Sequence, residues 1–533
     1  MRSFNFRSTV LTLLGIVPFL SCVSLCQAGP VVSVTGGQLR GQMLKENGAV
    51  FKGIPYAQPP LGDLRWKPTA PVKPWSGVRE TVQFGGTCAM NPIWGMPKVV
   101  NEDCLYLNVW APEWPPKSQK PVMVWIHGGG NVAGSGNENG ESFIRQGVVL
   151  VSFNYRLGIF GFLAHPELTA ESPEHASGNY GLMDQIAALK WVQENIGKFG
   201  GDAKNVTIFG ESAGAMDVNL LMASPQAKGL FQRVVAESGS ILIGGGAMPL
   251  SQAEKDGVKF AGLAGIRGKN SLTALRAASV EQLLEAFGKY AAPSGVPANL
   301  MVAIDGIVLP EPPAEVFASG KQLPTSLIIG INAREFSGPP AAADVKKQIE
   351  GDYGSLAAQA LPLYGITTKG DGKVSQGAPD PLYGNAGAQF ATDTTFRCPS
   401  MVVADWNSNA GIPTYQYQFS RGVPGHPEFG AIHASEVWYV FGNLDQQRPM
   451  KPNYEPADYA ISKTMQAYWA NFAKTGSPNG AGLPLWPKYQ ADTRKYLEFT
   501  DNGPVAGGEL RQKQCELFAE SLKKPGKSTG AQH

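Results

Sequence analysis

One short unit between residues 206 and 222 constrains the fold more than any other part of the sequence. Residues 206–209 form an apolar run of strand length, residues 213–222 have the pattern of a helix, and Gly-Glu-Ser-Ala-Gly at 210–214 joins the two. A strand that passes into a helix through so tight a turn is typical of proteins in which helices wrap a parallel or mixed sheet. The unit therefore predicts an α/β fold.

The same alternation of strand and helix patterns continues on both sides of this unit. Residues 122–126, 148–153 and 326–329 are apolar runs, as expected for strands that are covered on both faces. Between 182 and 199 apolar residues recur every three or four positions, which predicts an amphipathic helix. The sequence contains no internal repeat and no linker that would divide it. We therefore expect one large domain.

The predicted domain spans residues 29–522, with a disordered tail at 523–533. Residues 339–378 are rich in Ala, Gly and Pro, and we expect them to form helices and loops over one end of the sheet. The first 28 residues are set apart from this domain, because they have the pattern of a targeting segment.

Arg2 and Arg7 precede an apolar run at 10–20, and small residues lead up to Ala28. This order is that of a cleavable signal peptide. The apolar run is shorter than the roughly 20 residues of a membrane-spanning helix, so we expect no stable membrane insertion. The sequence predicts export to a secreted or periplasmic location, and a lipid anchor on a cysteine of this segment is the alternative.

The formal net charge is +2 and like charges form no runs, which argues against a nucleic-acid partner. No C-x-x-C or H-E-x-x-H spacing occurs, so we predict no metal and no cofactor. An exported chain favours disulfides over reduced thiols. Three pairings are open to the four cysteines outside the targeting segment, Cys88, Cys104, Cys398 and Cys515.

Ser212, at the centre of the tight turn, is the candidate nucleophile because such a turn exposes its hydroxyl at the start of a helix. A hydroxyl needs a base to remove its proton, and histidine is the usual one. Of the six histidines, His433 is the predicted base, because it lies far downstream and precedes an apolar stretch. His426 stands in a Gly- and Pro-rich turn and is the alternative.

Glu335 is the predicted acid that orients this histidine, because it follows the apolar strand at 326–329 by a few residues. If it is not the acid, Asp305 is the first alternative. His-Gly-Gly-Gly at 127–130 directly follows the strand at 122–126, and consecutive glycines leave backbone N–H groups free to point at one spot. The predicted oxyanion donors are the N–H groups of Gly129, Gly130 and Ala213.

Together these elements resemble the type-B carboxylesterases of the α/β-hydrolase fold, the family that also contains cholinesterases. The matching segments follow in order along nearly the whole mature chain, at 51–60, 64–66, 75–78, 102–109, 178–185, 199–214 and 430–433. The resemblance implies a triad of Ser212, Glu335 and His433 and the three oxyanion donors named above. It also implies a Cys88–Cys104 disulfide. Cys398 lies where many members carry a second bridge, which would pair it with Cys515.

The expected function is that of an exported serine esterase that hydrolyses small carboxylic esters through an acyl-enzyme intermediate. The alternatives are a catalytically inactive adhesion or binding protein on the same fold, and a lipase or amidase of the same class. Trp94 lies in a much shorter loop than the choline-binding tryptophan of cholinesterases, so the sequence does not predict choline-ester specificity.

Two departures from the family pattern bear on the substrate. Asn131 follows the glycines where many members have an aromatic residue, and Arg334 precedes Glu335 where the family usually has an acid. One hypothesis is that both side chains line the substrate pocket and make it polar. Such a pocket would favour esters of polar or carboxylate-bearing acids over plain alkanoates. The alternative is that Asn131 turns into a backbone hydrogen bond and Arg334 into solvent.

Overall fold

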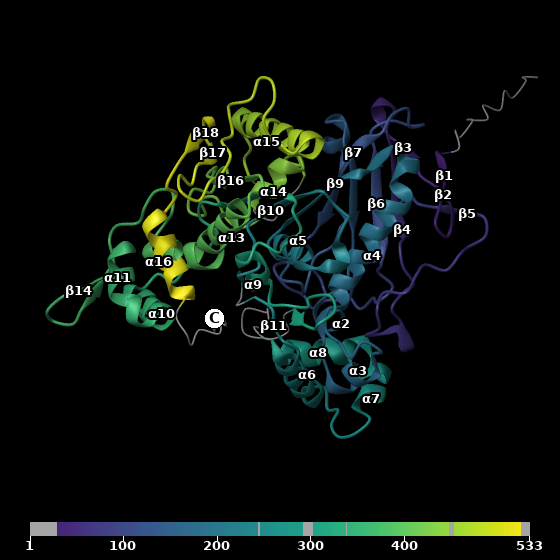
Figure 1. The fold of residues 1–533 in the computed structure, drawn as a ribbon, viewed down its shortest axis with the longest axis horizontal. Coiled ribbons are helices and arrows are strands. Elements are labelled where there is room, and N and C mark those ends of the chain that lie inside the picture. The colour runs from purple at the N-terminus through teal and green to yellow at the C-terminus, as the bar shows by residue number, and fades with distance from the viewer. Residues whose placement is uncertain (1–28, 244–245, 292–301, 337, 447–451, 524–533) are drawn as a thin grey trace, which may run out of the picture.

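The computed structural model describes residues 29–243, 246–291, 302–336, 338–446 and 452–523. The predicted signal peptide, residues 1–28, and residues 524–533 of the predicted tail lie outside the described residues. A sheet of eleven strands forms the centre of the protein (Figure 1). Across the sheet, the strands are β18 (Gly503–Gly507), β17 (Tyr496–Thr500), β16 (Thr414–Phe419), β13 (Ser326–Asn332), β10 (Arg233–Glu237), β9 (Gly201–Glu211), β7 (Lys120–Ile126), β8 (Val149–Phe153), β6 (Tyr106–Ala111), β4 (Ala49–Pro55) and β3 (Gln42–Met43).

The seven strands from β17 to β8 in this order run parallel to one another. The pairs β17–β18, β8–β6, β6–β4 and β4–β3 are antiparallel. The inner strands are buried along their length, β8 completely, because helices cover both faces of the sheet. This explains why their sequences are continuous apolar runs rather than alternating ones. The predicted α/β class with a mostly parallel sheet is confirmed.

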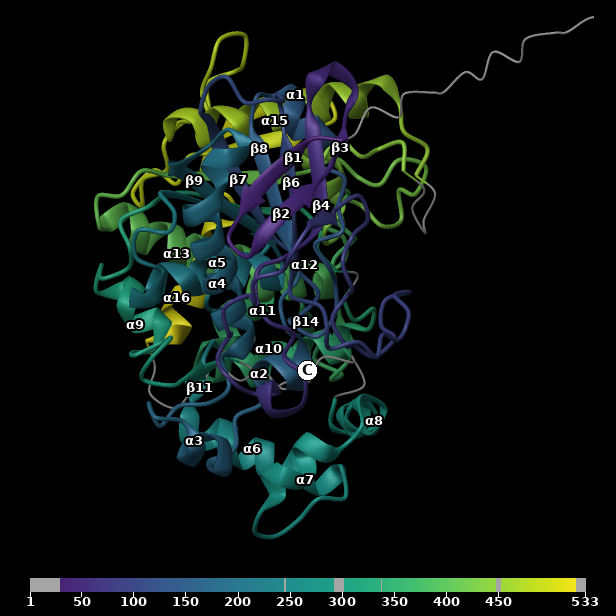
Figure 2. The ribbon, with the colours of Figure 1, turned by 90° about the vertical axis from the view of Figure 1, so that its right-hand side faces the viewer.

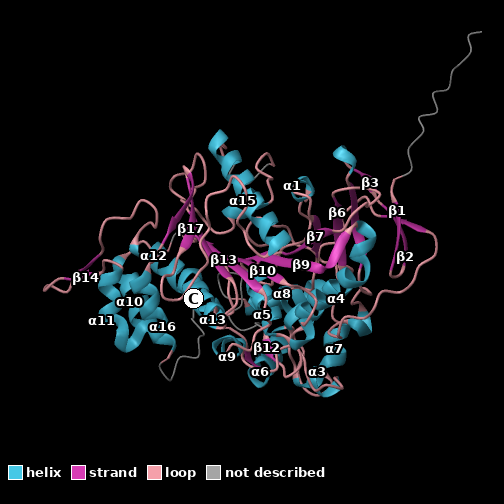
Figure 3. Ribbon diagram, turned by 45° about the horizontal axis from the view of Figure 1, so that its top comes forward, coloured by secondary structure: helices cyan, strands magenta, loops and turns pink. Residues whose placement is uncertain are grey.

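Helices on one face of the sheet are α4 (Tyr180–Asn195), α5 (Ala213–Ala223) and α13 (Cys398–Asn409), and α15 (Pro456–Thr475) covers the other face (Figure 3). The helix predicted over 182–199 is α4 followed by a 3₁₀ turn, Ile196–Phe199. It ends at Gly200, whose φ of 81° lies in the left-handed region that favours glycine.

Two helical groups extend beyond the sheet, each with its own apolar cluster. One contains α3 (Pro166–Glu171), α6 (Leu250–Leu263), α7 (Ser271–Ala277) and α8 (Val280–Tyr290), at the bottom of Figure 2. The other contains α10 (Ala342–Tyr353), α11 (Ala357–Leu363), α12 (Ala386–Thr392) and α16 (Gln512–Leu522), at the left of Figure 1. Residues 339–378 thus form helices and loops beside the sheet, as expected, together with the short hairpin of β14 (Thr367–Thr368) and β15 (Val374–Ser375).

The four cysteines form two disulfides, Cys88–Cys104 and Cys398–Cys515, and all four are buried. The second bridge joins α13 to α16, so it fixes the last described helix to a helix that covers one face of the sheet. Within the described ranges, no helix has the length and apolar character needed to cross a membrane. The same residues contain no cluster of His, Cys, Asp or Glu side chains that could hold a metal ion.

Candidate active site

Ser212 stands at the turn between β9 and α5, with φ 57° and ψ −121°. Such a backbone conformation is strained for a residue with a side chain, and it persists because the surroundings enforce it. The flanking glycines allow that close packing. A Cβ at Gly214 would lie 2.1 Å from the carbonyl oxygen of Ile126 at the end of β7, and one at Gly210 would lie 2.6 Å from the same atom. The strand end and the turn therefore touch backbone to backbone.

A chain of hydrogen bonds connects Ser212, His433 and Glu335. The Oγ of Ser212 lies 2.8 Å from Nε2 of His433, and Nδ1 of His433 lies 2.8 Å from Oε2 of Glu335. The backbone N–H of His433 also donates to the carbonyl of Glu335 at 3.1 Å. This second contact holds the two loops in register and leaves the imidazole between a hydroxyl and a carboxylate.

The three side chains meet because each follows a strand of the parallel sheet at its carboxyl end. Ser212 comes directly after β9, Glu335 comes three residues after β13 ends at Asn332, and His433 lies in the connection that follows β16. Carboxyl ends of parallel strands meet at the same edge of a sheet, where ligands usually bind. The topology therefore brings together residues that are 98 and 221 positions apart in the chain.

The glycine run predicted to supply backbone donors passes close to Ser212, because a Cβ at Gly128 would lie 3.1 Å from the Cβ of Ser212. Gly129 and Gly130 have φ values of 106° and 62°, which a residue with a side chain rarely adopts. Within the described ranges, their N–H groups donate to no other residue. Ala213 is the first residue of α5, where a backbone N–H has no carbonyl of its own helix to bond. These three donors remain available to a developing negative charge.

Comparisons with known proteins show the family to which the chain belongs. Residues 28–518 match the model of the carboxylesterase family. The chain belongs to this family. Liver carboxylesterase 1 of Mus musculus is 36% identical to it over 560 residues, which cover 95% of this chain and 96% of the mouse protein. Liver carboxylesterase of Sus scrofa is 34% identical over 559 residues, covering 93% of this chain and 95% of the pig protein.

Solved carboxylesterase structures share the fold. A PNB esterase superposes with a TM-score of 0.79 at 33% identity, covering 92% of this chain and 99% of that structure. The carboxylesterase EST55 of Geobacillus stearothermophilus gives a TM-score of 0.78 at 32% identity, covering 92% of this chain and 99% of that structure. The predicted α/β-hydrolase fold is confirmed, and the chain is a carboxylic-ester hydrolase.

Several buried groups around Ser212, His433 and Glu335 were not predicted. The Oε1 of Glu335 accepts hydrogen bonds from the backbone N–H of Asn332 and from the hydroxyl of Ser238, both at 2.7 Å. Ser238 also lies 3.1 Å from Oε1 of Glu436, whose Oε2 accepts from the Asn332 amide at 2.5 Å. Ser238 directly follows β10 and Glu436 follows His433 by three residues, but neither stands in a motif of its own.

Burial and the neighbouring Glu211 raise the pKa of Glu436 well above its usual range. A protonated Glu436 can donate to Ser238, which leaves the hydroxyl of Ser238 free to donate to Glu335. The carboxylate that faces the imidazole therefore accepts hydrogen bonds from both Ser238 and Asn332.

Glu211, the second residue of the Gly-Glu-Ser-Ala-Gly motif, is a further carboxylate beside the base. Its Oε1 lies 3.2 Å from Nε2 of His433. Burial raises the pKa of Glu211 to about 7. Burial by itself lowers the pKa of His433, but the charges of Glu211 and Glu335 outweigh this effect and raise it to about 9. The rings of Phe396 and Phe336 lie 4.7 Å and 5.7 Å from the imidazole ring and form an apolar wall beside it.

The structure places the alternatives of the sequence analysis elsewhere. Asp305 is buried, and its Oδ1 accepts three backbone N–H groups, those of Ile307, Val308 and Leu309, so it holds a turn. His426 lies 3.2 Å from Glu428 in an exposed loop. Neither contacts Ser212.

The pocket prediction for Asn131 needs correction. Its side chain is buried and both of its polar atoms are bonded within the protein. Its amide donates to Oδ1 of Asp217 at 3.0 Å, and its Oδ1 accepts from the hydroxyl of Tyr155 at 2.9 Å. The side chain of Arg334 is half-buried and packs beside Gly384 and Gly430. Its place on the rim of a substrate pocket stays a prediction.

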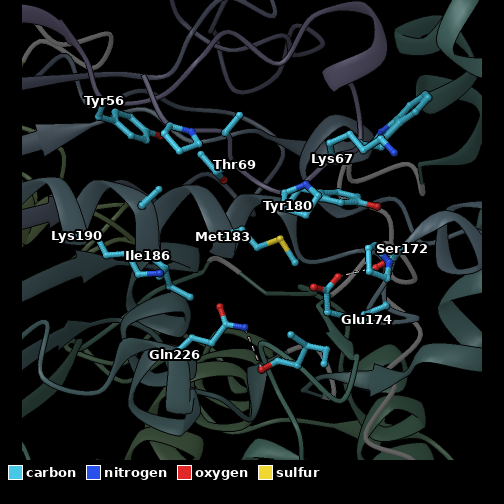
Figure 4. A pocket seen from close by; sticks show the side chains of 18 of the residues that line it. Tyr56, Lys67, Thr69, Ser172, Glu174, Tyr180, Met183, Ile186, Lys190 and Gln226 are labelled. Carbon is cyan, nitrogen blue, oxygen red and sulfur yellow. Dashed lines mark hydrogen bonds between the residues drawn. The ribbon is translucent and has the colours of Figure 1, made fainter. Parts of the chain in front are cut away.

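A cavity of about 500 Å³ lies apart from the triad (Figure 4). Helix α4 forms one wall with Tyr180, Met183 and Ile186, and the segment 67–72 forms another. Gln226 closes one end by donating to the carbonyl of Ile307 at 3.4 Å. None of the three triad residues lines this cavity, so it is not the immediate surroundings of the reacting serine.

Proposed function

We propose that the chain is an exported serine carboxylesterase that hydrolyses small carboxylic esters with Ser212, His433 and Glu335. The observation that carries this proposal is the unbroken chain of two 2.8 Å hydrogen bonds from the serine hydroxyl through the imidazole to a buried carboxylate. A base in this position can remove the serine proton as the hydroxyl attacks.

The reaction has two halves. In the first, Ser212 attacks the ester carbonyl, His433 takes its proton, and the N–H groups of Gly129, Gly130 and Ala213 stabilise the oxyanion. His433 then gives the proton to the leaving alcohol, and an acyl-enzyme remains. In the second half, water attacks the acyl group while His433 takes its proton. His433 then returns that proton to Ser212 as the carboxylic acid leaves. Glu335 keeps the imidazole in the required tautomer and stabilises its charged form.

The binding-protein alternative gives no reason for this arrangement. An adhesion module has no physical need for a strained serine, a base at 2.8 Å and a buried acid in line. A lipase or amidase would use the same groups, and the choice among ester classes rests on the acyl and alcohol sites rather than on the triad.

Export is supported by the leader-like pattern of residues 1–28 and by two buried disulfides, which persist in oxidising compartments. We expect the mature protein to begin at Gly29. Sequencing the N-terminus of protein recovered from the culture medium or the periplasm tests this. An intact leader on cytoplasmic protein would contradict it.

Ser212→Ala tests the triad. We expect the rate of p-nitrophenyl acetate hydrolysis to fall by at least about a thousandfold, since the nucleophile is gone. A fluorophosphonate should label Ser212 in the parent protein, as mass spectrometry of the modified peptide would show. Ser224→Ala is the matched control, because Ser224 caps the other end of α5 and its buried hydroxyl has no partner among the described residues. Labelling of another residue, or an active Ser212→Ala variant, would overturn the proposal.

A further inference from the structure

The proposed oxyanion hole is built from two separate segments of chain. Gly129 and Gly130 belong to the loop that leaves β7, whereas Ala213 begins α5. Donors that stabilise an oxyanion act only when they converge on one point, and a displacement of about 1 Å can cost about a hundredfold in rate. Some contact must therefore fix the loop relative to the helix.

A buried side-chain hydrogen bond connects these two segments. Asn131 directly follows the glycines, and Asp217 lies on α5, one turn beyond Ala213. The amide Nδ2 of Asn131 donates to Oδ1 of Asp217 at 3.0 Å. Asp217 is fully buried and Asn131 is 6% exposed, so water does not compete for this bond.

Two further side chains form hydrogen bonds with Asn131 and Asp217. Gln185 of α4 donates to the second oxygen of Asp217 at 2.5 Å. The hydroxyl of Tyr155 lies 2.9 Å from Oδ1 of Asn131 and 2.8 Å from the carbonyl oxygen of His127, at the start of the glycine loop. Asp217 makes no ion pair within the described ranges. Its carboxylate is thus held by amide donors alone, one of which is the oxyanion loop.

Asn131 also has the backbone geometry that such a link requires. Its φ is 57°, in the left-handed region that asparagine tolerates better than most residues. Its carbonyl accepts a hydrogen bond from Gly158 at 2.6 Å. Both the main chain and the side chain of this residue are therefore fixed.

We propose that the Asn131–Asp217 hydrogen bond sets the separation of the two halves of the oxyanion hole and makes both residues positioning residues for ester hydrolysis. This inference rests on the proposed function, because it takes Gly129, Gly130 and Ala213 as the oxyanion donors. It predicts that loss of the bond lowers transition-state stabilisation while the binding of the ground-state ester is retained.

A pair of reciprocal substitutions tests this. Asn131→Asp places two carboxylates face to face and removes the donor. We expect kcat for p-nitrophenyl acetate to fall about 10- to 100-fold with KM changed less than about threefold, because the donors lose their alignment. Adding Asp217→Asn restores a donor and an acceptor in exchanged positions. The double variant should regain kcat to within about threefold of the parent value.

A merely structural role would not produce this pattern. Asn219→Asp is the matched control, since it changes a buried amide to a carboxylate on the same helix. Among the described residues, the Asn219 side chain bonds only the carbonyl of Ala215. It should lower the melting temperature and leave kcat within about twofold of the parent. A trifluoromethyl ketone, which mimics the tetrahedral oxyanion, should lose affinity for the Asn131→Asp protein by the same factor as kcat/KM falls.

If the Asn131→Asp protein does not fold, Asn131→Gly provides the test, because glycine accepts the same backbone conformation without the side chain. It should show the same fall in kcat. An unchanged kcat in the single variants, or a defect that the exchanged pair does not repair, would overturn the inference. Fluorophosphonate labelling of Ser212 in the parent protein tests the proposed function separately, and it can succeed while this inference fails.

Discussion

Glu211, the second residue of the Gly-Glu-Ser-Ala-Gly motif, affects the pKa of His433. It lies 3.2 Å from His433, and its charge contributes to the raised pKa of that imidazole. In the proposed mechanism His433 must be neutral to accept the serine proton, so activity should be lost below the pKa of His433. A raised pKa moves this acid limb of the rate profile to higher pH.

Glu211→Gln should therefore shift the acid limb of kcat/KM to lower pH, because removal of a negative neighbour lowers the pKa of His433. The measurement is kcat/KM for a neutral ester from pH 5 to pH 10. Glu311→Gln, at an exposed glutamate paired with Lys321, is the control and should leave the profile in place. An acid limb that stays fixed, or moves to higher pH, in the Glu211→Gln protein would contradict this account.

Residues that carry chemistry in a motif could be proposed from sequence, and residues that support them could not. Ser212 stands in a recognisable turn, and His433 and Glu335 follow from chain order and strand ends. Ser238 and Glu436 have no motif, because their role depends on which strands lie side by side. Asn131 was assigned to the pocket from its place beside the glycines, but neighbouring positions in sequence do not fix which way a side chain turns.

At the scale of elements, the junction of β7, β9 and α5 is the tightest part of the site. A Cβ added at Gly214 would meet the backbone of Ile126, which cannot move without shifting the strand that leads to the glycine loop. The two glycines around Ser212 are thus required by packing between elements as well as by the turn itself.

We expect Gly214→Ala to lower the free energy of unfolding by about 1–3 kcal/mol, because it overpacks this junction. Esterase activity should fall as well, since the serine and its oxyanion donors share the junction. Urea unfolding and initial rates measure both. Gly351→Ala in α10 is the control, because a Cβ there meets nothing within 4 Å and alanine raises helix stability by up to about 1 kcal/mol. Equal stability of the Gly214→Ala protein and its parent would refute the packing argument.

Apolar runs identified the inner strands but underestimated their length. The strand predicted at 206–209 is part of β9, which runs from Gly201 to Glu211. Gly201 pairs with Lys120 of β7, and regular pairing resumes at Val206 after a register shift. The edge strand β18 contains no apolar run, and its pairing with β17 is a property of the folded sheet. An apolar run in the sequence indicates a strand that is buried on both faces, and only strands in the middle of the sheet are buried in this way.

At the scale of the whole molecule, the two disulfides close loops of different size. Cys88–Cys104 spans 16 positions and Cys398–Cys515 spans 117 positions. A longer closed loop restricts the unfolded chain more, by about 3 kcal/mol for 15 residues and almost 5 kcal/mol for 100 residues.

Replacement of both Cys398 and Cys515 by Ala should therefore destabilise the protein more than the same change at Cys88 and Cys104. All four side chains are buried, so each pair serves as the control for the other. The urea midpoints of the two double variants make the comparison. A larger loss from the Cys88 and Cys104 variant would show that local packing, rather than loop closure, dominates.

The alternation of strands and helices along the chain was sufficient to predict the α/β class, and the resemblance to type-B carboxylesterases supplied the α/β-hydrolase fold. The two helical groups beside the sheet were less predictable. Their helices are amphipathic, but which of them share a cluster depends on contacts between distant segments, as when α16 joins α10 and α12.

The bridge between Cys398 and Cys515 also bears on how the folded chain would respond to proteolysis. The segment that it closes contains His433, and an exposed loop of that segment presents Leu485, which is 73% exposed. A single cut there would leave both fragments covalently joined, with β16, β17 and α15 still packed in one core. The nicked chain would keep β17 in the central sheet. Only a protease and a reductant acting together could release the C-terminal fragment, which carries β17, β18 and α16.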